Sequence, residues 1–160
     1  QNRTTIPSGV ILSVVLAALN LLLHFLPLVR FEGLLEDYTL SILDLLKYGS
    51  ESFFEEQQNV AGVLRVIIIG LMIMIGIFTL ILLVQAASGN GFRGGFFAWL
   101  NVCIVTSFLL QMGILVYIYS GLQEAGMESW LKIDTSGIFY IISSIASPII
   151  IGVASTGVND

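Results

Sequence analysis

The sequence predicts an all-α integral membrane protein, a bundle of four transmembrane helices with a small structured first outer loop. Apolar residues make up 56% of the 160 residues and charged residues only 11%, whereas a soluble domain carries roughly a quarter charged residues. The mean hydropathy is +0.96. Four apolar stretches each approach the roughly 20 residues that a helix needs to cross a hydrocarbon core of about 30 Å. We therefore expect one membrane domain over residues 1–160.

Each of the four apolar stretches is predicted to be a helix. In lipid the backbone must satisfy its own hydrogen bonds, which leaves helices and closed barrels as the possible spans. The stretches are about twice as long as barrel strands and do not alternate strictly between apolar and polar residues. Trp99 and Tyr117 stand near the ends of the third stretch, and Trp130 and Tyr140 flank the start of the fourth, as in the aromatic belts found at membrane interfaces. The predicted helices cover about residues 6–28, 53–87, 96–120 and 137–155.

The first outer loop, at about residues 29–52, has a pattern of its own. Its segments VRFE and YTLSI alternate apolar and polar residues, which is typical of half-buried strands. A helix over residues 34–48 is the competing interpretation, because several apolar residues there fall on one helical face. We favour a small hairpin followed by a short helix from Ser41, since Ser41 and Asp44 resemble a capping box.

The charge of the chain is concentrated in this region. The net charge is −5, and the segment from Val29 to Asn59 holds seven of the eleven acidic residues. Nucleic-acid binding requires basic patches and is therefore not expected. An acidic outer surface would instead attract a cationic or polar protein partner through charge complementarity. The candidate partner contacts are Asp37, Asp44, Glu55 and Glu56.

The orientation in the membrane follows from the lysine and arginine residues near the helix ends. Arg3 and Arg93 lie on the side of the two termini. The opposite side carries the other four cations, Arg30, Lys47, Arg65 and Lys132. The raw count favours an external N-terminus, whereas the density of cations on the short segments favours an internal one. We expect a multi-pass protein of the cell (plasma or inner) membrane with both termini cytoplasmic.

Uncharged polar residues form stripes within the predicted spans. None of the four apolar cores contains Asp, Glu, Lys or Arg, although transport and proton relay normally require ionisable residues there. The candidate intramembrane polar and packing residues are Asn20, His24, Ser107, Gln111, Ser144, Pro148 and Gly152. We interpret these stripes as faces through which helices pack and hydrogen-bond. A narrow polar path, or a pH sensor at His24, is the alternative.

No catalytic centre is predicted. Cys103 is the only cysteine and His24 the only histidine, so the ligands of a zinc site are missing and the usual catalytic triads cannot be built. The glycine-rich segment GNGFRGG differs from a phosphate-binding loop. We expect no catalytic residue, no metal site and no cofactor.

The layout of the predicted spans and loops resembles four-span proteins of the claudin type. These also have a short N-terminus, a long structured first outer loop, a tight turn and a shorter second outer loop. The claudin signature of a tryptophan followed by two cysteines is absent from the first loop, so no junction function is carried over. The segment LPLVRFEGLLEDYTLSILDLL is also similar to the region after the first helix in small uncharacterised bacterial four-span proteins, a resemblance that implies no functional residue.

Two functions from different classes are compatible with these features. The first is a non-enzymatic protein that acts through protein contacts, as an accessory or structural subunit of a membrane complex or as an immunity-type protein. Its expected partners are the lipid bilayer and other membrane protein subunits, or further copies of itself. The second is an oligomeric channel or small-molecule transporter built round the polar stripes.

Overall fold

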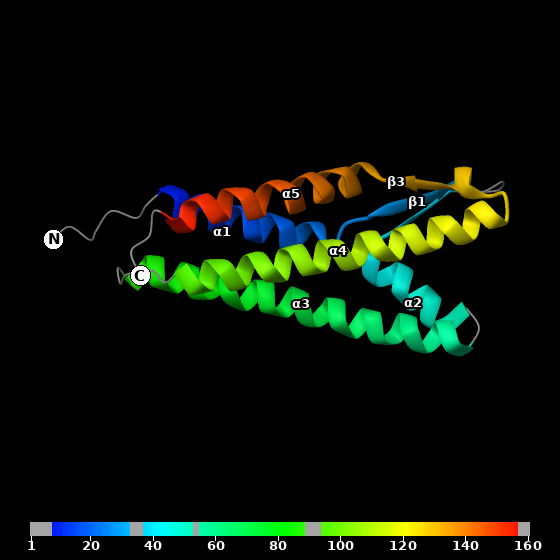
Figure 1. Cartoon of the computed structure of the whole chain (residues 1–160), viewed down its shortest axis with the longest axis horizontal. Helices are drawn as coiled ribbons and strands as arrows, with labels where there is room; N and C mark the ends of the chain where they lie inside the picture. The colour runs from blue at the N-terminus through cyan, green and yellow to red at the C-terminus, as the bar shows by residue number, and fades with distance from the viewer. Residues whose placement is uncertain (1–7, 33–36, 53–54, 89–93, 157–160) are drawn as a thin grey trace.

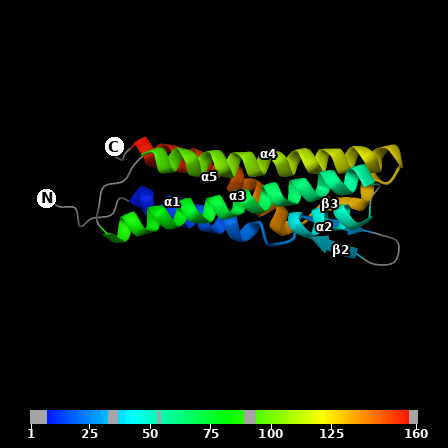
Figure 2. The same cartoon turned by 90° about the horizontal axis from the view of Figure 1, so that it is seen from below.

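The computed structural model describes residues 8–32, 37–52, 55–88 and 94–156. Four helices lie side by side along one axis: α1 (Ser8–Leu23), α3 (Glu55–Ser88), α4 (Gly94–Glu124) and α5 (Thr135–Thr156). A small sheet and the short helix α2 (Ile42–Ser52) lie at one end of this bundle, and the start of α1 and the end of α5 lie at the other (Figures 1 and 2). The protein is thus mostly helical, as predicted, with a sheet that an all-α fold lacks.

The four long helices form a ring in which each packs mainly against two of the others. α1 packs against α5 and α3, and α4 packs against α3 and α5. In the described part of the chain three helical segments are long and apolar enough to cross a membrane: Asn59–Gln85, Gly95–Glu124 and Thr135–Ala154. Only 28–33% of each of their most apolar windows is buried. Most of their apolar surface therefore faces outward, as expected of helices surrounded by lipid rather than by water.

Polar and aromatic residues bracket the apolar parts of two of these helices. In α3 the stretch from Arg65 to Gln85 rises about 30 Å, and in α4 the stretch from Trp99 to Tyr117 rises about 27 Å. Trp99 and Tyr117 are both exposed. These lengths match the thickness of a hydrocarbon core. We call the part of the bundle between these two pairs of residues the apolar belt.

The first helix is shorter than predicted. We expected a helix over residues 6–28, but α1 ends at Leu23. The backbone N–H groups of His24, Phe25 and Leu26 bond to carbonyls three residues back, at 3.0–3.3 Å. This tightened last turn precedes Pro27, which has no N–H and disfavours the helical conformation in the residue before it. The predicted end was therefore wrong, because Pro27 stops the helix and α1 covers only about 24 Å.

The other three long helices agree more closely with the expected ranges. The predicted ranges 53–87, 96–120 and 137–155 correspond to α3, α4 and α5, and α4 ends four residues later than expected. The four additional residues of α4 lie beyond Tyr117 and therefore outside the apolar belt. A fourth spanning helix is not among the three segments long enough to cross a membrane, because α1 has 16 described residues.

The sheet joins the two connections at the same end of the bundle. Its strands are β1 (Val29–Glu32), β2 (Asp37–Leu40) and β3 (Leu131–Ile133), in the order β2-β1-β3 and all antiparallel. The β1–β2 hairpin confirms the prediction, with Val29 opposite Leu40. β3 was not predicted; it follows a short 3₁₀ helix, η1 (Glu128–Trp130), and pairs with β1 so that Arg30 lies opposite Lys132.

Helix α2 begins where the sequence predicted. The Asp44 backbone N–H donates to the Ser41 hydroxyl at 3.3 Å, which is the N-cap bond of a capping box. Ile42, Leu45 and Leu46 are buried, and α2 packs on the part of the bundle formed by α3. A helix over residues 34–48 was the alternative; it is excluded because residues 37–40 form β2.

A close backbone contact joins the sheet to α5. The backbone N–H of Asp134 donates to the Leu28 carbonyl at 3.1 Å, and the N–H of Leu28 donates to the Leu40 carbonyl at 2.9 Å. Gly137, in the first turn of α5, packs so closely on the Leu28 carbonyl that a β-carbon at this position would overlap the carbonyl oxygen. Glycine is therefore required where α1, the sheet and α5 meet.

Candidate functional site

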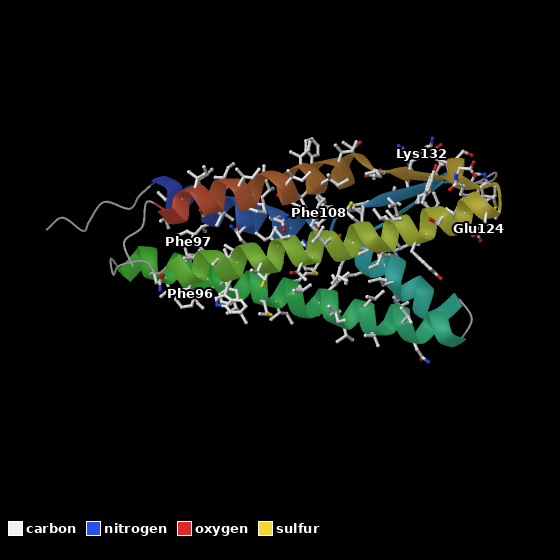
Figure 3. All side chains as sticks on the ribbon, viewed as in Figure 1. Phe96, Phe97, Phe108, Glu124 and Lys132 are labelled. Carbon is white, nitrogen blue, oxygen red and sulfur yellow. The ribbon has the colours of Figure 1, made fainter. Side chains whose placement is uncertain are left out.

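Polar side chains from three helices meet inside the bundle. We define the polar core as Asn20, His24, Ser107, Gln111, Tyr140, Ser143, Ser144 and Ser147. None of these residues is more than 7% exposed. They come from α1 and the turn after it, from α4 and from α5. Phe108, the residue after Ser107, lies midway along the bundle in Figure 3, so the polar core occupies the middle of the molecule.

His24 links the end of α1 to α4. Its Nδ1 lies 2.8 Å from the Asn20 carbonyl oxygen, and its Nε2 lies 2.8 Å from the Ser107 hydroxyl. A carbonyl oxygen can only accept, so Nδ1 carries the proton. In the neutral ring Nε2 is then the acceptor, and the Ser107 hydroxyl donates to it. The histidine thus caps a carbonyl that α1 leaves without a helical partner, because the backbone N–H of His24 bonds to Leu21 instead.

The bond between Gln111 and Ser107 has the direction that this tautomer requires. The Gln111 side-chain N–H donates to the Ser107 hydroxyl oxygen at 3.0 Å. Ser107 therefore accepts from Gln111 and donates to His24, which in turn donates to Asn20. The three bonds form one chain with a single direction, from α4 to the carboxyl end of α1. Each member uses a group that would otherwise be buried without a partner.

Asn20 links α1 to α5. Its side-chain N–H groups donate to Ser144 at 3.0 Å and to Ser143 at 3.3 Å. The Ser143 and Ser147 hydroxyls lie 3.4 Å apart, one helical turn from each other. The two serines at positions 143 and 144 thus take both donors of one amide, which fixes α5 against α1 in rotation and in height.

Tyr140 is the remaining member of the polar core, although the sequence predicted it to lie at a membrane interface. Its position near the start of the fourth span suggested an interfacial aromatic residue, whereas it is 1% exposed. The ring packs edge-on against the His24 ring, with centroids 5.0 Å apart, and lies 6.3 Å from the Phe108 ring. Its hydroxyl has Ser107 and Ser144 as polar neighbours without hydrogen-bond geometry to either. The Asn20 side-chain oxygen is likewise buried without a partner.

A hydrogen bond between α4 and α5 lies outside the polar core, nearer the end of the bundle where α1 begins and α5 ends. The Asn101 side-chain N–H donates to the Pro148 carbonyl at 3.0 Å. Pro148 lies inside α5, which continues through it to Thr156. Gly152 is half-buried beside Asn101. Sequence reasoning missed Asn101, although an amide side chain in a largely apolar stretch was a signal that it has a specific partner.

The polar core lies level with the middle of the apolar stretch of α3. The Leu21 side chain packs against Gly76, which lies about 16 Å along α3 from Arg65 and about 14 Å from Gln85. Leu21 is therefore near the middle of the apolar belt, and His24 is less than one turn further along. α1 thus ends level with the middle of the apolar stretch of α3, and the side chain of His24 donates to one of the last carbonyl groups of α1.

The acidic candidates lie apart from the polar core, at the sheet end of the molecule. Asp37 in β2 and Asp44 in α2 are both exposed. Glu55 and Glu56 fall in the first turn of α3, and their side chains lie outside the described residues. Arg30 and Glu32, two residues apart on β1, form a partly exposed ion pair at 3.8 Å. The structure does not bring Asp37 and Asp44 into one hydrogen-bonded group.

The chemistry of the polar core is that of neutral hydrogen bonding. Within the described residues no group of three His, Cys, Asp or Glu side chains could hold a metal ion. Cys103 is buried one turn from Ser107 and is a free thiol. The arrangement can hold helices together or bind a small hydrogen-bonding molecule.

Comparison of the chain with protein-family models, with curated proteins and with solved structures gives no match. The fold and the contacts described above are therefore the basis for any functional argument.

Proposed function

We propose that this chain is a non-enzymatic membrane protein that acts through contacts with other membrane proteins, as an accessory or structural subunit of a complex or as an immunity-type protein. The observation that carries the proposal is the folded unit at one end of the bundle. This unit consists of α2 and the β2-β1-β3 sheet. Strand pairing between two distant connections keeps it in one shape, as a recognition surface requires.

In this proposal the chain crosses the bilayer four times. The first crossing combines α1 with the turn and extended segment from His24 to Leu28, which together reach the level at which α5 begins, because Leu28 bonds to Asp134. Non-helical backbone at this depth is tolerated where its polar groups are paired. In this segment the backbone N–H groups of His24, Phe25, Leu26 and Leu28 bond to carbonyls, while the side chains of Phe25 and Leu26 are exposed. Both termini would then lie on the opposite side from the sheet, on the cytoplasmic side of the cell membrane.

The chemistry of the exposed end supports a polar or cationic partner. Asp37 and Asp44 are exposed there. Exposed carboxylates contribute mainly to the rate of encounter and to the choice of partner. We therefore expect capture of the partner to depend on ionic strength.

The test begins with extraction of the protein from its native membrane in mild detergent, followed by determination of the mass and protein content of the particle. A second polypeptide in a fixed ratio supports the proposal. Neutralising the four acidic candidates together, as Asp37→Asn, Asp44→Asn, Glu55→Gln and Glu56→Gln, should then weaken capture of that polypeptide. The matched control is Glu124→Gln, an exposed carboxylate of α4 at the same end. Equal capture by the quadruple variant and the control would contradict the role of the acidic residues.

A channel or small-molecule transporter is the second candidate, because polar side chains lie at membrane depth. In the polar core these side chains bond to one another within one chain, which supports a packing role over the lining of a pore between subunits. A pure homo-oligomer, together with liposome flux that is lost on Gln111→Leu or Asn20→Leu, would favour the transporter. Tight liposomes with folded protein would count against it.

A further inference from the structure

Two polar atoms of the polar core have no partner, although both are fully enclosed. The Asn20 side chain is 0% exposed and Tyr140 is 1% exposed. The Asn20 amide uses both of its N–H groups on Ser143 and Ser144, while its oxygen Oδ1 accepts no bond. The Tyr140 hydroxyl lies near the Ser107 and Ser144 side chains but has the geometry of a hydrogen bond with neither. At membrane depth an unpaired polar atom cannot turn to solvent, so each carries the full cost of its desolvation.

The two unpaired atoms belong to the same part of the polar core. Ser144 accepts from the Asn20 amide at 3.0 Å and is also a polar neighbour of the Tyr140 hydroxyl. Asn20 approaches from α1, while Tyr140 and Ser144 lie one turn apart on α5. Ser144 therefore lies beside both side chains, at a point where α1 meets α5.

We propose that this point binds one water molecule, which bridges Asn20 and Tyr140. The water donates a proton to the Asn20 Oδ1 and accepts the proton of the Tyr140 hydroxyl. Ser144 supplies the third contact, since its oxygen already accepts from Asn20 and its own proton is available to the water. Three partners are the usual number for a buried water in a protein. With the water in place, the Asn20 Oδ1 and the Tyr140 hydroxyl, the two unpartnered atoms of the polar core, each have a partner.

The site selects water by the kinds of groups it presents. It offers one acceptor and two hydroxyls, all uncharged. The described elements around it, α1, α4 and α5, bring no Asp, Glu, Lys or Arg side chain to the polar core, so nothing balances the charge of an ion. An apolar guest would leave the Asn20 Oδ1 and the Tyr140 hydroxyl unpaired. A neutral molecule that both donates and accepts is the one class that meets all three groups.

The experiment is magic-angle-spinning NMR of the isotopically labelled full chain in lipid bilayers, with magnetisation transferred from water to the side chains. The expected result is transfer from a bound water to both the Asn20 amide and the Tyr140 ring. Tyr140→Phe keeps the ring and removes the hydroxyl, and it should abolish the transfer to Asn20. The matched control is Thr79→Val, which removes a buried hydroxyl of α3 that bonds to the Ile75 carbonyl of its own helix; it should leave the transfer unchanged.

Two results would overturn the proposal. One is the absence of water transfer in the unmodified protein, as when Tyr140 rotates to bond Asn20 directly. The other is a transfer to Asn20 that persists in Tyr140→Phe. If Tyr140→Phe does not fold, Asn20→Leu gives the reciprocal test: water transfer to Tyr140 should be lost, and its persistence would contradict a bridge.

Discussion

The two halves of the helix ring are held together by different interactions. α1, α4 and α5 are joined by side-chain hydrogen bonds of Asn20, His24 and Asn101. α3 meets its neighbours mainly through apolar side chains such as Ile68, Ile75 and Leu82, and its buried Thr79 bonds within its own helix. We call the contacts among α1, α4 and α5 the hydrogen-bonded half of the ring, and the contacts of α3 with α1 and α4 the apolar half.

This difference matters because lipid changes the value of each kind of contact. Between helices in a bilayer there is little hydrophobic driving force, since lipid chains are as apolar as leucine. Apolar packing therefore attaches α3 without strongly preferring one rotation. A hydrogen bond between helices is directional, so the bonds of the polar core define the heights and rotations of α1, α4 and α5.

The largest expected effect is at Gly137, where α5 packs on the Leu28 carbonyl. α3 takes no part in this contact. Gly137→Ala should reduce the free energy of unfolding by about 3 kcal/mol, because the new methyl group meets the Leu28 backbone carbonyl, which cannot move aside without distorting the sheet. The measurement is unfolding in mixed detergent micelles. The matched control, Gly70→Ala on α3, has open space around it and should change stability by less than about 1 kcal/mol. Equal stability of the two variants would remove the distinction.

The next effect is expected at His24. His24→Leu leaves the Asn20 carbonyl and the Ser107 hydroxyl without their partner, so we expect a loss of about 2 kcal/mol. Thr79→Val on α3 is the comparison, and it should cost less than about 1 kcal/mol because the bond it removes lies within one helix. The same micelle assay measures both variants. A larger loss for Thr79→Val would reverse the assignment of the two halves.

A smaller effect is expected at the second contact between α4 and α5. Asn101→Leu removes the bond to the Pro148 carbonyl and should lower the unfolding free energy by about 1 kcal/mol. Val102→Leu, an exposed neighbour on α4, should leave it unchanged. If both variants have the same unfolding free energy as the unmodified protein, the Asn101 bond contributes nothing to the association of α4 with α5.

The smallest effect is expected in the sheet. Arg30 and Lys132 lie directly opposite each other on β1 and β3, and like charges in this arrangement repel. Lys132→Glu replaces the repulsion with attraction and should raise the thermal midpoint slightly, corresponding to a few tenths of a kcal/mol. Lys132→Gln should give about half of that gain. A lower thermal midpoint for Lys132→Glu would show that another contact of Lys132 outweighs its repulsion from Arg30.

Much of the fold could be predicted from local patterns. The lengths of α3, α4 and α5, the β1–β2 hairpin and the start of α2 at Ser41 all depend on residues close together in the chain. β3 could not be predicted in the same way, because three residues carry little periodicity and its partner β1 lies about 100 residues away in the sequence. The early end of α1 is different, because its cause is local: Pro27 disfavours the helical conformation in the residue before it, and this signal is present in the sequence.

The site could be predicted in part. The spacing of Asn20 with His24, of Ser107 with Gln111, and of Ser144 with Pro148 indicated one face on each of three helices. Which faces meet depends on the order of the helices in the ring, which no local pattern encodes. Tyr140 was assigned to the interface because aromatic residues near span ends usually lie there; its burial follows from contact with His24, a residue more than 100 positions earlier.

The most direct test of this account is a double-mutant cycle between His24 and Ser107, with the variants His24→Leu, Ser107→Ala and their combination. The account holds that the polar side chains join α1, α4 and α5 within one chain. It predicts that the two substitutions are coupled by about 1 kcal/mol, near the upper part of the range measured between membrane helices. Strictly additive losses in monomeric particles would show that the two side chains do not stabilise the fold through one another, and would contradict the account.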